Sequence, residues 1–325
     1  MKIFVAGASG AIGRRLVPLL VSRGHEVVAT TRTRAKARLV YELGATPVVA
    51  DGLDREAVIG AVTQAAPEVV IHQMTSLASA TNLRRFDKVF ALTNRLRTEG
   101  TDHLLEAARQ AGARRFVAQS FGNWNYERSG GMAKTEDDPL DPSPPRSMRR
   151  SLAAIVHLES VVVGATDIEG IALRYANLYG PGTSTALEGP FTEAVRRRRL
   201  PIIGAGAGVW SFVHVDDAAS ATLAAVERGE AGIYNVADDA PARTSVWLPE
   251  FARILGAGAP RHVPAWLGRL AAGEAVVSMF TQTRGASNAK AKRELGWRLQ
   301  YPTWRYGFRV GLADGAARRE LEEAA

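Results

Sequence analysis

Short apolar runs alternate with stretches of helical spacing along the first half of the chain. The apolar runs predict buried strands at 2–6, 25–30, 46–50, 68–73, 115–119 and 171–174. Between them, apolar residues recur every three or four positions, which predicts helices at 14–21, 35–43, 55–65, 84–111 and 149–163. Strands that alternate with helices in this way form βαβ units and a doubly wound parallel sheet of the α/β class.

The segment that follows the strand predicted at 115–119 is irregular. Residues 122–148 contain two adjacent glycines, and four prolines lie between 139 and 145. An irregular stretch of this length inside a compact domain is usually functional. From residue 176 onward, a second and shorter alternation predicts a further α/β unit.

The first predicted strand runs directly into a glycine-rich turn, which reads Gly-Ala-Ser-Gly-Ala-Ile-Gly over residues 7–13. Glycines let the backbone turn tightly and approach a ligand, and the N–H groups of a following helix favour a pyrophosphate. The alternative is a turn with a purely structural role. We expect a dinucleotide site formed by Gly7, Ser9, Gly10, Ala11, Ile12 and Gly13.

The end of the second predicted strand indicates which dinucleotide binds. An acidic residue at this place holds the adenosine ribose of NAD, whereas a nearby arginine accommodates the 2′-phosphate of NADP. Residues 30–36 contain no acid, and Thr31 stands roughly where the acid would be, followed by Arg32. This predicts NADP(H) rather than NAD(H), unless these cations belong to an ordinary loop.

The other parallel strands bring polar residues to the same edge of the sheet, because ligands in such folds sit beyond the carboxyl ends of the strands. Asp51 could accept the adenine amino group or could simply cap the next helix. Further cofactor contacts are expected from Gly52, His72, Gln73, Gln119 and Asn177.

Four further segments follow the glycine-rich turn in a fixed order, and together with that turn they match the motifs of a known family. They are Leu-Arg-Tyr-Ala-Asn-Leu-Tyr-Gly-Pro-Gly at 173–182, Phe-Val-His-Val-Asp-Asp-Ala-Ala at 212–219, Gly-Ile-Tyr-Asn-Val-Ala at 232–237, and Ala-Lys-Ala-Lys-Arg-Glu-Leu-Gly-Trp at 289–297. With them, the chain resembles the extended short-chain dehydrogenase/reductase family, the NAD(P)-dependent epimerase/dehydratase group, over nearly its whole length. The resemblance implies a Rossmann domain over 1–175, to which 210–238 returns, and a smaller substrate domain over 176–325.

The chemistry of that family requires a Tyr as acid/base, a Lys four residues later, and a Ser or Thr that binds the substrate oxygen. Glu159 matches the family's glutamate, which places Ile155 at the Lys position and Ser151 at the Tyr position. The family mechanism therefore does not carry over. We expect Tyr126 of the long loop as proton donor, since a phenol can serve as one, with Ser120 and Asp138 as further catalytic candidates. Alternatively, Tyr126 only shapes the loop.

The substrate pocket also departs from the family pattern. Sugar-nucleotide enzymes of the family commonly carry an Arg just before the Phe-Val-His motif, and this chain has Trp210 there. Losing a bidentate phosphate ligand favours a small apolar or aromatic substrate over a sugar nucleotide. Trp124, Tyr179 and Phe191 are expected to line the same pocket; the alternative is that Trp210 merely packs between the domains.

The amino-acid composition excludes several kinds of site and partner. The 325-residue chain has no cysteine, so disulfides and thiolate sites are excluded, and its six histidines are dispersed, so no metal site is expected. The formal charge is +8, but the densest basic run, 196–199, lies near the end of a predicted helix without interleaved aromatics, which indicates solvated surface rather than a nucleic-acid site. No apolar run approaches the ~20 residues that span a bilayer. A strand starting at residue 2 leaves no room for a signal peptide, so we expect a cytoplasmic protein.

Three functions remain open. The favoured one is an NADP(H)-dependent oxidoreductase that reduces a carbonyl or an activated double bond of a small metabolite with a non-standard proton donor. The others are a non-redox isomerase, cyclase or lyase on the same scaffold, and a catalytically silent NADP-binding sensor. The resemblance also implies a homodimer through the helices at 84–111 and 149–163.

Overall fold

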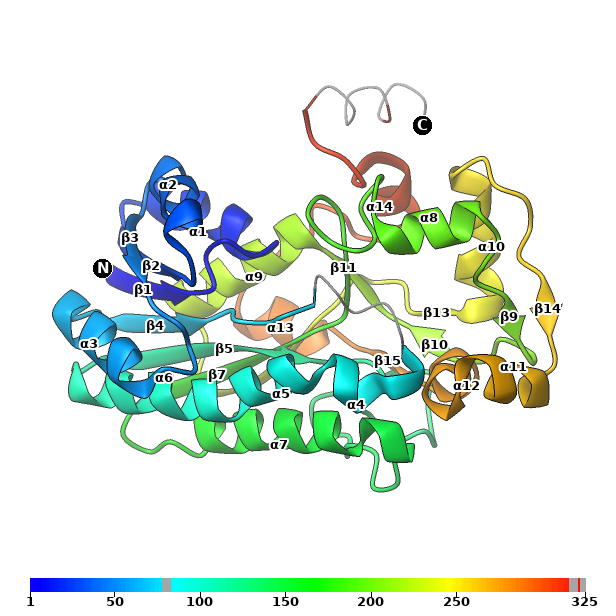
Figure 1. The fold of residues 1–325 in the computed structure, drawn as a ribbon, viewed down its shortest axis with the longest axis horizontal. Helices are drawn as coiled ribbons and strands as arrows, with labels where there is room; N and C mark the ends of the chain where they lie inside the picture. Colours follow the sequence, from blue (N-terminus) through cyan, green and yellow to red (C-terminus); the bar gives the residue numbers. More distant parts are fainter. Residues whose placement is uncertain (78–82, 316–320, 322–325) are drawn as a thin grey trace.

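A seven-stranded parallel sheet runs through the molecule (Figure 1). The computed structural model describes residues 1–77, 83–315 and 321. In spatial order the strands are β12 (Gly232–Val236), β7 (Glu169–Tyr175), β5 (Arg115–Phe121), β4 (Val69–His72), β1 (Lys2–Ala6), β2 (Glu26–Thr31) and β3 (Thr46–Val49). Every neighbouring pair is parallel, as the alternation predicts. The α/β doubly wound class is confirmed.

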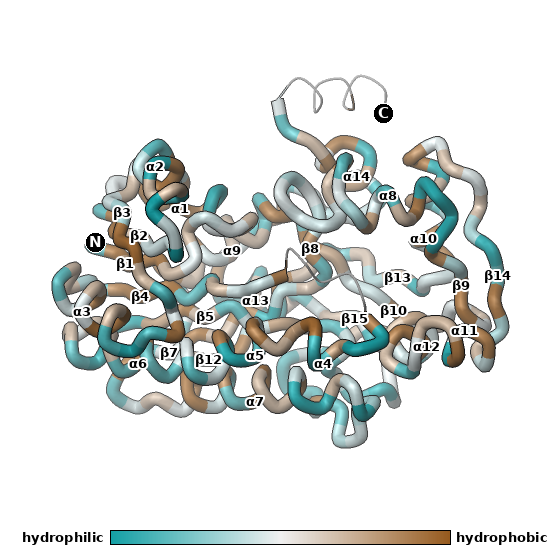
Figure 2. Tube along the Cα trace, viewed as in Figure 1, coloured by the Kyte–Doolittle hydropathy of each residue, from teal (hydrophilic) through white to brown (hydrophobic). Residues whose placement is uncertain are grey.

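Helices cover both faces of the sheet, which explains why its central strands are almost uniformly apolar. One face carries α1 (Gly13–Ser22), α2 (Arg34–Glu42) and α9 (Val215–Glu227), and the other carries α3 (Arg55–Ala65), α5 (Ala91–Arg97), α6 (Glu99–Gln110) and α7 (Arg149–Val163). Figure 2 shows β1 in hydrophobic colours, in contrast to the mixed outer helices.

The sequence located most elements of this half within a few residues, and the predicted 149–163 helix has the bounds of α7. The stretch predicted as helical over 84–111 is interrupted. It forms η1 (Leu83–Arg85), α4 (Phe86–Val89), α5 and α6, with breaks at Phe90 and Thr98. The break at Thr98 ends α5 at Arg97.

The remaining elements form the other end of the molecule. Its helices are α8 (Pro190–Arg196), α10 (Thr244–Ile254), α11 (Ala265–Ala272), α12 (Glu274–Thr281) and α14 (Trp304–Val310). Its two-stranded ladders pair β8 (Asn177–Tyr179) with β11 (Phe212–His214), β9 (Ile202–Ile203) with β14 (His262–Val263), β10 (Val209–Trp210) with β13 (Ala242–Arg243), and β6 (Ala133–Lys134) with β15 (Gly285–Ala286). The chain returns to the large sheet through α9 and β12, and α13 (Ala289–Glu294) packs on β12.

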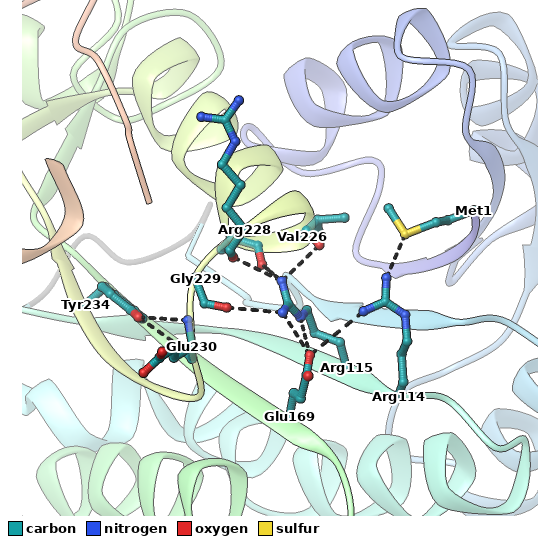
Figure 3. A network of polar contacts seen from close by, with 10 residues as sticks. Met1, Arg114, Arg115, Glu169, Val226, Arg228, Gly229, Glu230 and Tyr234 are labelled. Carbon is teal, nitrogen blue, oxygen red and sulfur yellow. Dashed lines mark hydrogen bonds and ion pairs between the residues drawn. The ribbon is translucent and has the colours of Figure 1, made fainter. Parts of the chain in front are cut away.

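An arginine ties this return to the amino end of the sheet. Arg115, at the start of β5, donates to the backbone carbonyls of Ala225, Val226, Arg228 and Gly229 and pairs with Glu169 at 2.8 Å (Figure 3). A cation that caps the last carbonyls of a helix offsets its dipole. The contact fixes the end of α9 against the sheet, at the edge opposite to the glycine turn.

Candidate functional site

The parallel register brings most of the candidate residues to one edge. Ala6, the last residue of β1, pairs with Thr30 of β2 and His72 of β4, and Ser120 of β5 pairs with Arg174 of β7. The glycine loop (Gly7–Gly13) follows β1 directly. All of these residues therefore lie at the carboxyl edge of the sheet, where this fold class binds ligands.

The glycine loop has the geometry of a pyrophosphate cradle. Gly7 has a φ of +98°, and a Cβ there would lie 2.6 Å from the carbonyl oxygen of Gln73. A Cβ on Gly13 would lie 2.5 Å from the oxygen of Ala8, so this glycine allows α1 to pack closely on the loop. Gly10 is exposed, and Ile12 supplies no side-chain cap to α1. The N–H groups of Arg14 and Arg15 donate to the carbonyls of Gly10 and Ile12, whereas those of residues 11–13 have no acceptor among the described residues. These unbonded N–H groups fit the pyrophosphate of a dinucleotide.

At the end of β2, the hydroxyl of Thr31 is buried and has no hydrogen-bond partner among the described residues, whereas Arg32 is exposed. Asp51 is exposed and accepts from the N–H of Leu53 at 3.0 Å, and it is Asp54 that caps α3. A Cβ at Gly52 would lie 2.4 Å from the sulfur of Met74. Asp51 and Gly52 thus shape the turn after β3, while Thr31 presents an unsatisfied polar atom.

After β4, the side chains of His72 and Gln73 differ in whether they can still hydrogen-bond a ligand. The Nε2 of His72 lies 3.1 Å from the Leu96 carbonyl, and its Nδ1 accepts from the N–H of Met74 at 3.2 Å. Burial lowers the pKa of His72 to about 4, so the ring is neutral and both nitrogens are occupied by backbone. Gln73 donates to the Tyr175 hydroxyl at 3.0 Å, and its Oε1 is buried with no donor to it from the residues that the structure describes. Of the two, Gln73 is the one that could accept from a ligand.

Gln119 and Asn177 lie further along the same edge. Gln119 is buried on β5, with 8% of its surface exposed. Asn177 is half-buried, and its Nδ2 donates to the carbonyl of Ser211 at 2.9 Å.

A buried ionic network lies between β5, β7 and α7. Glu159 accepts two hydrogen bonds from Arg174, at 2.8 and 2.7 Å, and one from the Ser120 hydroxyl at 2.6 Å. Arg174 also donates to the Tyr126 oxygen at 3.1 Å, and Tyr126 in turn donates to the side chain of Asn235. Burial opposes charge on Arg174, but the Glu159 carboxylate raises its pKa above the ordinary value. The network joins the large sheet to the long loop.

This network does not support the catalytic roles expected of Tyr126 and Ser120. Tyr126 is fully buried, and burial raises its pKa to about 12, so the phenol keeps its proton, which it donates to Asn235 while its oxygen accepts from Arg174. The Ser120 hydroxyl is committed to Glu159. Asp138 accepts from the backbone of Thr135 and pairs with Lys134 at 3.0 Å, and these contacts lower its pKa. An ionised carboxylate is a poor proton donor, and here it holds the loop.

The sequence of helix α7 contains neither tyrosine nor lysine. Ser151 is buried, donates to Asp87 at 2.7 Å and accepts from Asn94 at 3.0 Å. Ile155, one turn later, is fully buried in an apolar cluster. His157 points to the other side of the helix and lies 2.8 Å from Asp102 of α6.

The aromatic candidates mainly build a core. The indole of Trp210 donates to the carbonyl of Met279 at 2.9 Å, and its ring lies 4.9 Å from that of Trp247. Tyr179 is fully buried between His214 and Phe308. Trp210 and Tyr179 therefore pack in the interior, which matches the packing alternative for Trp210.

Trp124 and Phe191 are placed differently. Trp124 packs edge-on against Phe86 of α4, and Phe191 is only partly buried against Trp247. These two remain candidates to contact a substrate.

Sequence reasoning missed Arg97, the last residue of α5. It is 5% exposed, and its Nε is buried and has no acceptor within residues 1–77 and 83–315. A signal was present in the pattern, because Arg97 lies at four-residue spacing between Thr93 and Thr101, both fully buried. A basic residue in phase with a buried face is a functional candidate.

Within the described ranges, no group of three or more His, Asp or Glu side chains is placed to hold a metal ion. No helix in those ranges combines the length and apolar character needed to cross a bilayer.

Known proteins resemble the chain in sequence and in fold. A model of the NAD dependent epimerase/dehydratase family matches residues 3–237. A 3-diazoavenalumate denitrifying reductase from a Streptomyces species is 46% identical over 95% of this chain and 99% of that protein. A 4-hydroxy-2-methyl-3-oxo-4-farnesyl-3,4-dihydroquinoline-1-oxide ketoreductase from Stigmatella aurantiaca is 29% identical over 99% and 91% of the two chains. The structure of the Thermus thermophilus UDP-glucose 4-epimerase in complex with NAD superposes over all of both chains with a TM-score of 0.73 and 26% identity.

Proposed function

The chain belongs to the NAD dependent epimerase/dehydratase family and is an oxidoreductase of the short-chain dehydrogenase/reductase type, and we propose that it reductively removes a diazo group from a small aromatic substrate. The observation that carries this proposal is the sequence of helix α7, which contains neither tyrosine nor lysine. The alignment on Glu159 predicts Ser151 and Ile155 at the positions of the family's tyrosine and lysine. The substrate class follows the activity for which the Streptomyces relative is named.

Reduction of a ketone and reduction of a diazonium cation differ in their need for a proton. A ketone that accepts a hydride becomes an alkoxide and must be protonated, which is the task of a positioned acid. A diazonium cation that accepts a hydride is neutralised by it. The C–N bond then breaks, dinitrogen leaves, and the carbon ends with hydrogen in place of nitrogen, so atoms and charge balance without a further proton. An active site for this reaction needs no Tyr-Lys pair.

The cofactor is NADP(H) in this proposal. The glycine loop would hold the pyrophosphate, Thr31 and the exposed Arg32 would face the 2′-phosphate, and the free Oε1 of Gln73 would accept from a ribose hydroxyl. When bound, the reduced nicotinamide supplies the hydride. The absence of an acid in residues 30–36 supports NADP(H) over NAD(H).

In this proposal, the protein itself binds the substrate and shields it from water. Ile155 is a buried apolar residue at the position aligned with the family's lysine, and Trp124 and Phe191 are available for an aromatic ring. Trp210, buried where sugar-nucleotide enzymes carry an arginine, supports a substrate without a diphosphate.

Carbonyl reduction is the second candidate, because the Stigmatella relative is named a ketoreductase. It would require a donor, and Ser151, held by Asp87 and Asn94, is the hydroxyl of α7 nearest to that role.

The experiment is NADPH oxidation, followed by absorbance, with benzenediazonium and with a panel of ketones and enones. We expect oxidation with the diazonium salt and one dinitrogen released per NADPH. Turnover of ketones alone would favour the second candidate. NADPH binding without turnover of either class would contradict an oxidoreductase assignment to these substrates.

A further inference from the structure

Arg97 is a buried cation without a hydrogen-bond or ion-pair partner in the part of the chain that the structure describes. Its side chain is 5% exposed, and in residues 1–77 and 83–315 no hydrogen bond or ion pair reaches its guanidinium, whose Nε is fully enclosed. An arginine charge that is buried without an acceptor costs several kcal/mol. Such a cost is tolerated where a ligand supplies the missing acceptor.

The place of Arg97 in the fold puts this charge at the ligand edge. The carbonyl of Leu96, its neighbour, contacts the His72 ring at the end of β4. Burial lowers the pKa of Arg97 to about 10, and the Glu159 carboxylate partly opposes that shift. Its charge also helps to lower the pKa of His72. The guanidinium therefore lies within electrostatic range of both the carboxyl end of β4 and α7, beside which α5 runs (Figure 1).

Glu159 does not neutralise Arg97. Both of its oxygens accept from Arg174, and one of them also accepts from Ser120. One carboxylate thus faces two guanidinium groups, and this buried set carries one positive charge in excess. On the same face of α7, at four-residue spacing from Glu159, Ile155 and Ser151 add no charge.

We propose that Arg97 binds an anionic oxygen group of a ligand at the carboxyl edge of the sheet, either a carboxylate on the substrate or a phosphate of the cofactor. The planar guanidinium matches both groups, because it donates two parallel hydrogen bonds to neighbouring oxygens. The identity of the ligand rests on the proposed function, whereas the need for an anion rests on Arg97 itself.

The test is calorimetric titration of purified protein with NADP⁺ and, after saturation, with cinnamate and its neutral analogue cinnamamide. Arg97→Met removes the charge and keeps the length of the side chain, and Arg97→Lys keeps the charge. Arg95→Met is the matched control, because Arg95 lies on the same helix, is exposed, and pairs with Glu99 at 2.7 Å. A charged hydrogen bond is worth about 10- to 100-fold in affinity.

We expect Arg97→Met to weaken either cinnamate or NADP⁺ by that factor, to leave cinnamamide unaffected, and to leave the Tm of the ligand-free protein unchanged or higher. Arg97→Lys should recover part of the loss. Loss for cinnamate identifies a substrate carboxylate, and loss for NADP⁺ identifies a cofactor phosphate.

The proposal is overturned if both affinities stay within twofold of the Arg95→Met protein, or if the wild type binds neither anion. It is also overturned if Arg97→Met fails to fold, because a cation without partners contributes nothing to the ligand-free fold. These are binding measurements. A protein that loses anion binding with Arg97→Met but never turns over a diazonium salt would contradict only the proposed function.

Discussion

The glycine loop and the α7 side lie at the same edge of the sheet and offer a ligand different things. The loop has an exposed Gly10 and an uncapped first turn of α1. The α7 side, which we define as Ser120, Ser151, Ile155, Glu159 and Arg174, is buried, and its hydroxyl and charged groups are bonded to other protein groups. The glycine loop leaves N–H groups for a cofactor, whereas the polar groups of the α7 side bond to one another and to neighbouring protein groups. A reaction that needs only a hydride is consistent with both.

The largest effect should come from breaking the α7 side. Glu159→Gln leaves the buried Arg174 without its carboxylate, and we expect the free energy of unfolding to fall by about 3–5 kcal/mol. Urea denaturation measures this change. The control is Glu169→Gln, whose partner Arg115 keeps its carbonyl contacts and whose own side chain is 52% exposed, so about 1 kcal/mol or less is expected. Equal losses for the two variants would contradict the comparison.

His72 lies between the two sides and should make stability depend on pH. Its pKa is about 4 in the folded protein against an ordinary value of 6.5, so the unfolded chain binds more protons between these pH values. Stability from this group is complete above pH 6.5 and is lost as pH falls toward 4, by about 3 kcal/mol.

His72→Asn removes this titration, so the difference in unfolding free energy between wild type and variant should shrink by that amount between neutral pH and the folded-state pKa of His72. An unchanged difference across this range would mean that His72 titrates normally.

A substitution in the glycine loop should lower the affinity for the cofactor rather than the stability of the fold. Gly10→Val places a side chain where the cofactor pyrophosphate is expected, and a Cβ there meets only the Gly7 oxygen, at 3.3 Å. We expect NADPH affinity to fall about 100-fold, equivalent to about 2.7 kcal/mol, with little change in Tm. Gly60→Ala, in open space on α3, should leave affinity unchanged. If Gly10→Val binds NADPH normally, the loop is a structural turn.

The smallest effect is expected at Tyr126. Its hydroxyl is enclosed between Arg174 and Asn235, so Tyr126→Phe should lower stability by about 1–2 kcal/mol and change the turnover rate with a diazonium salt by less than twofold. Steady-state kinetics at neutral pH tests this. A turnover rate that falls by about two orders of magnitude, the scale of general acid catalysis, would return Tyr126 to the role of proton donor.

The sequence predicted the features that depend on local pattern. Residues 7–13 and the apolar strands are read from neighbouring positions, and they appear where expected. The buried network could not be read in this way, because its members meet only through the fold; Tyr126 and Asn235 are 109 positions apart. Trp210 shows the same limit, since a large aromatic residue fits a ligand pocket and a protein core equally well from sequence alone.

The measurement that tests the central claim most directly is the single-turnover rate of NADPH oxidation with benzenediazonium in H2O and in D2O, between about pH 6 and 7.5. If the protein supplies no proton in the reductive step, the rate will be the same in both solvents and across this range. A rate that slows twofold or more in D2O, or that falls as pH rises, would reveal a proton donor and contradict the account.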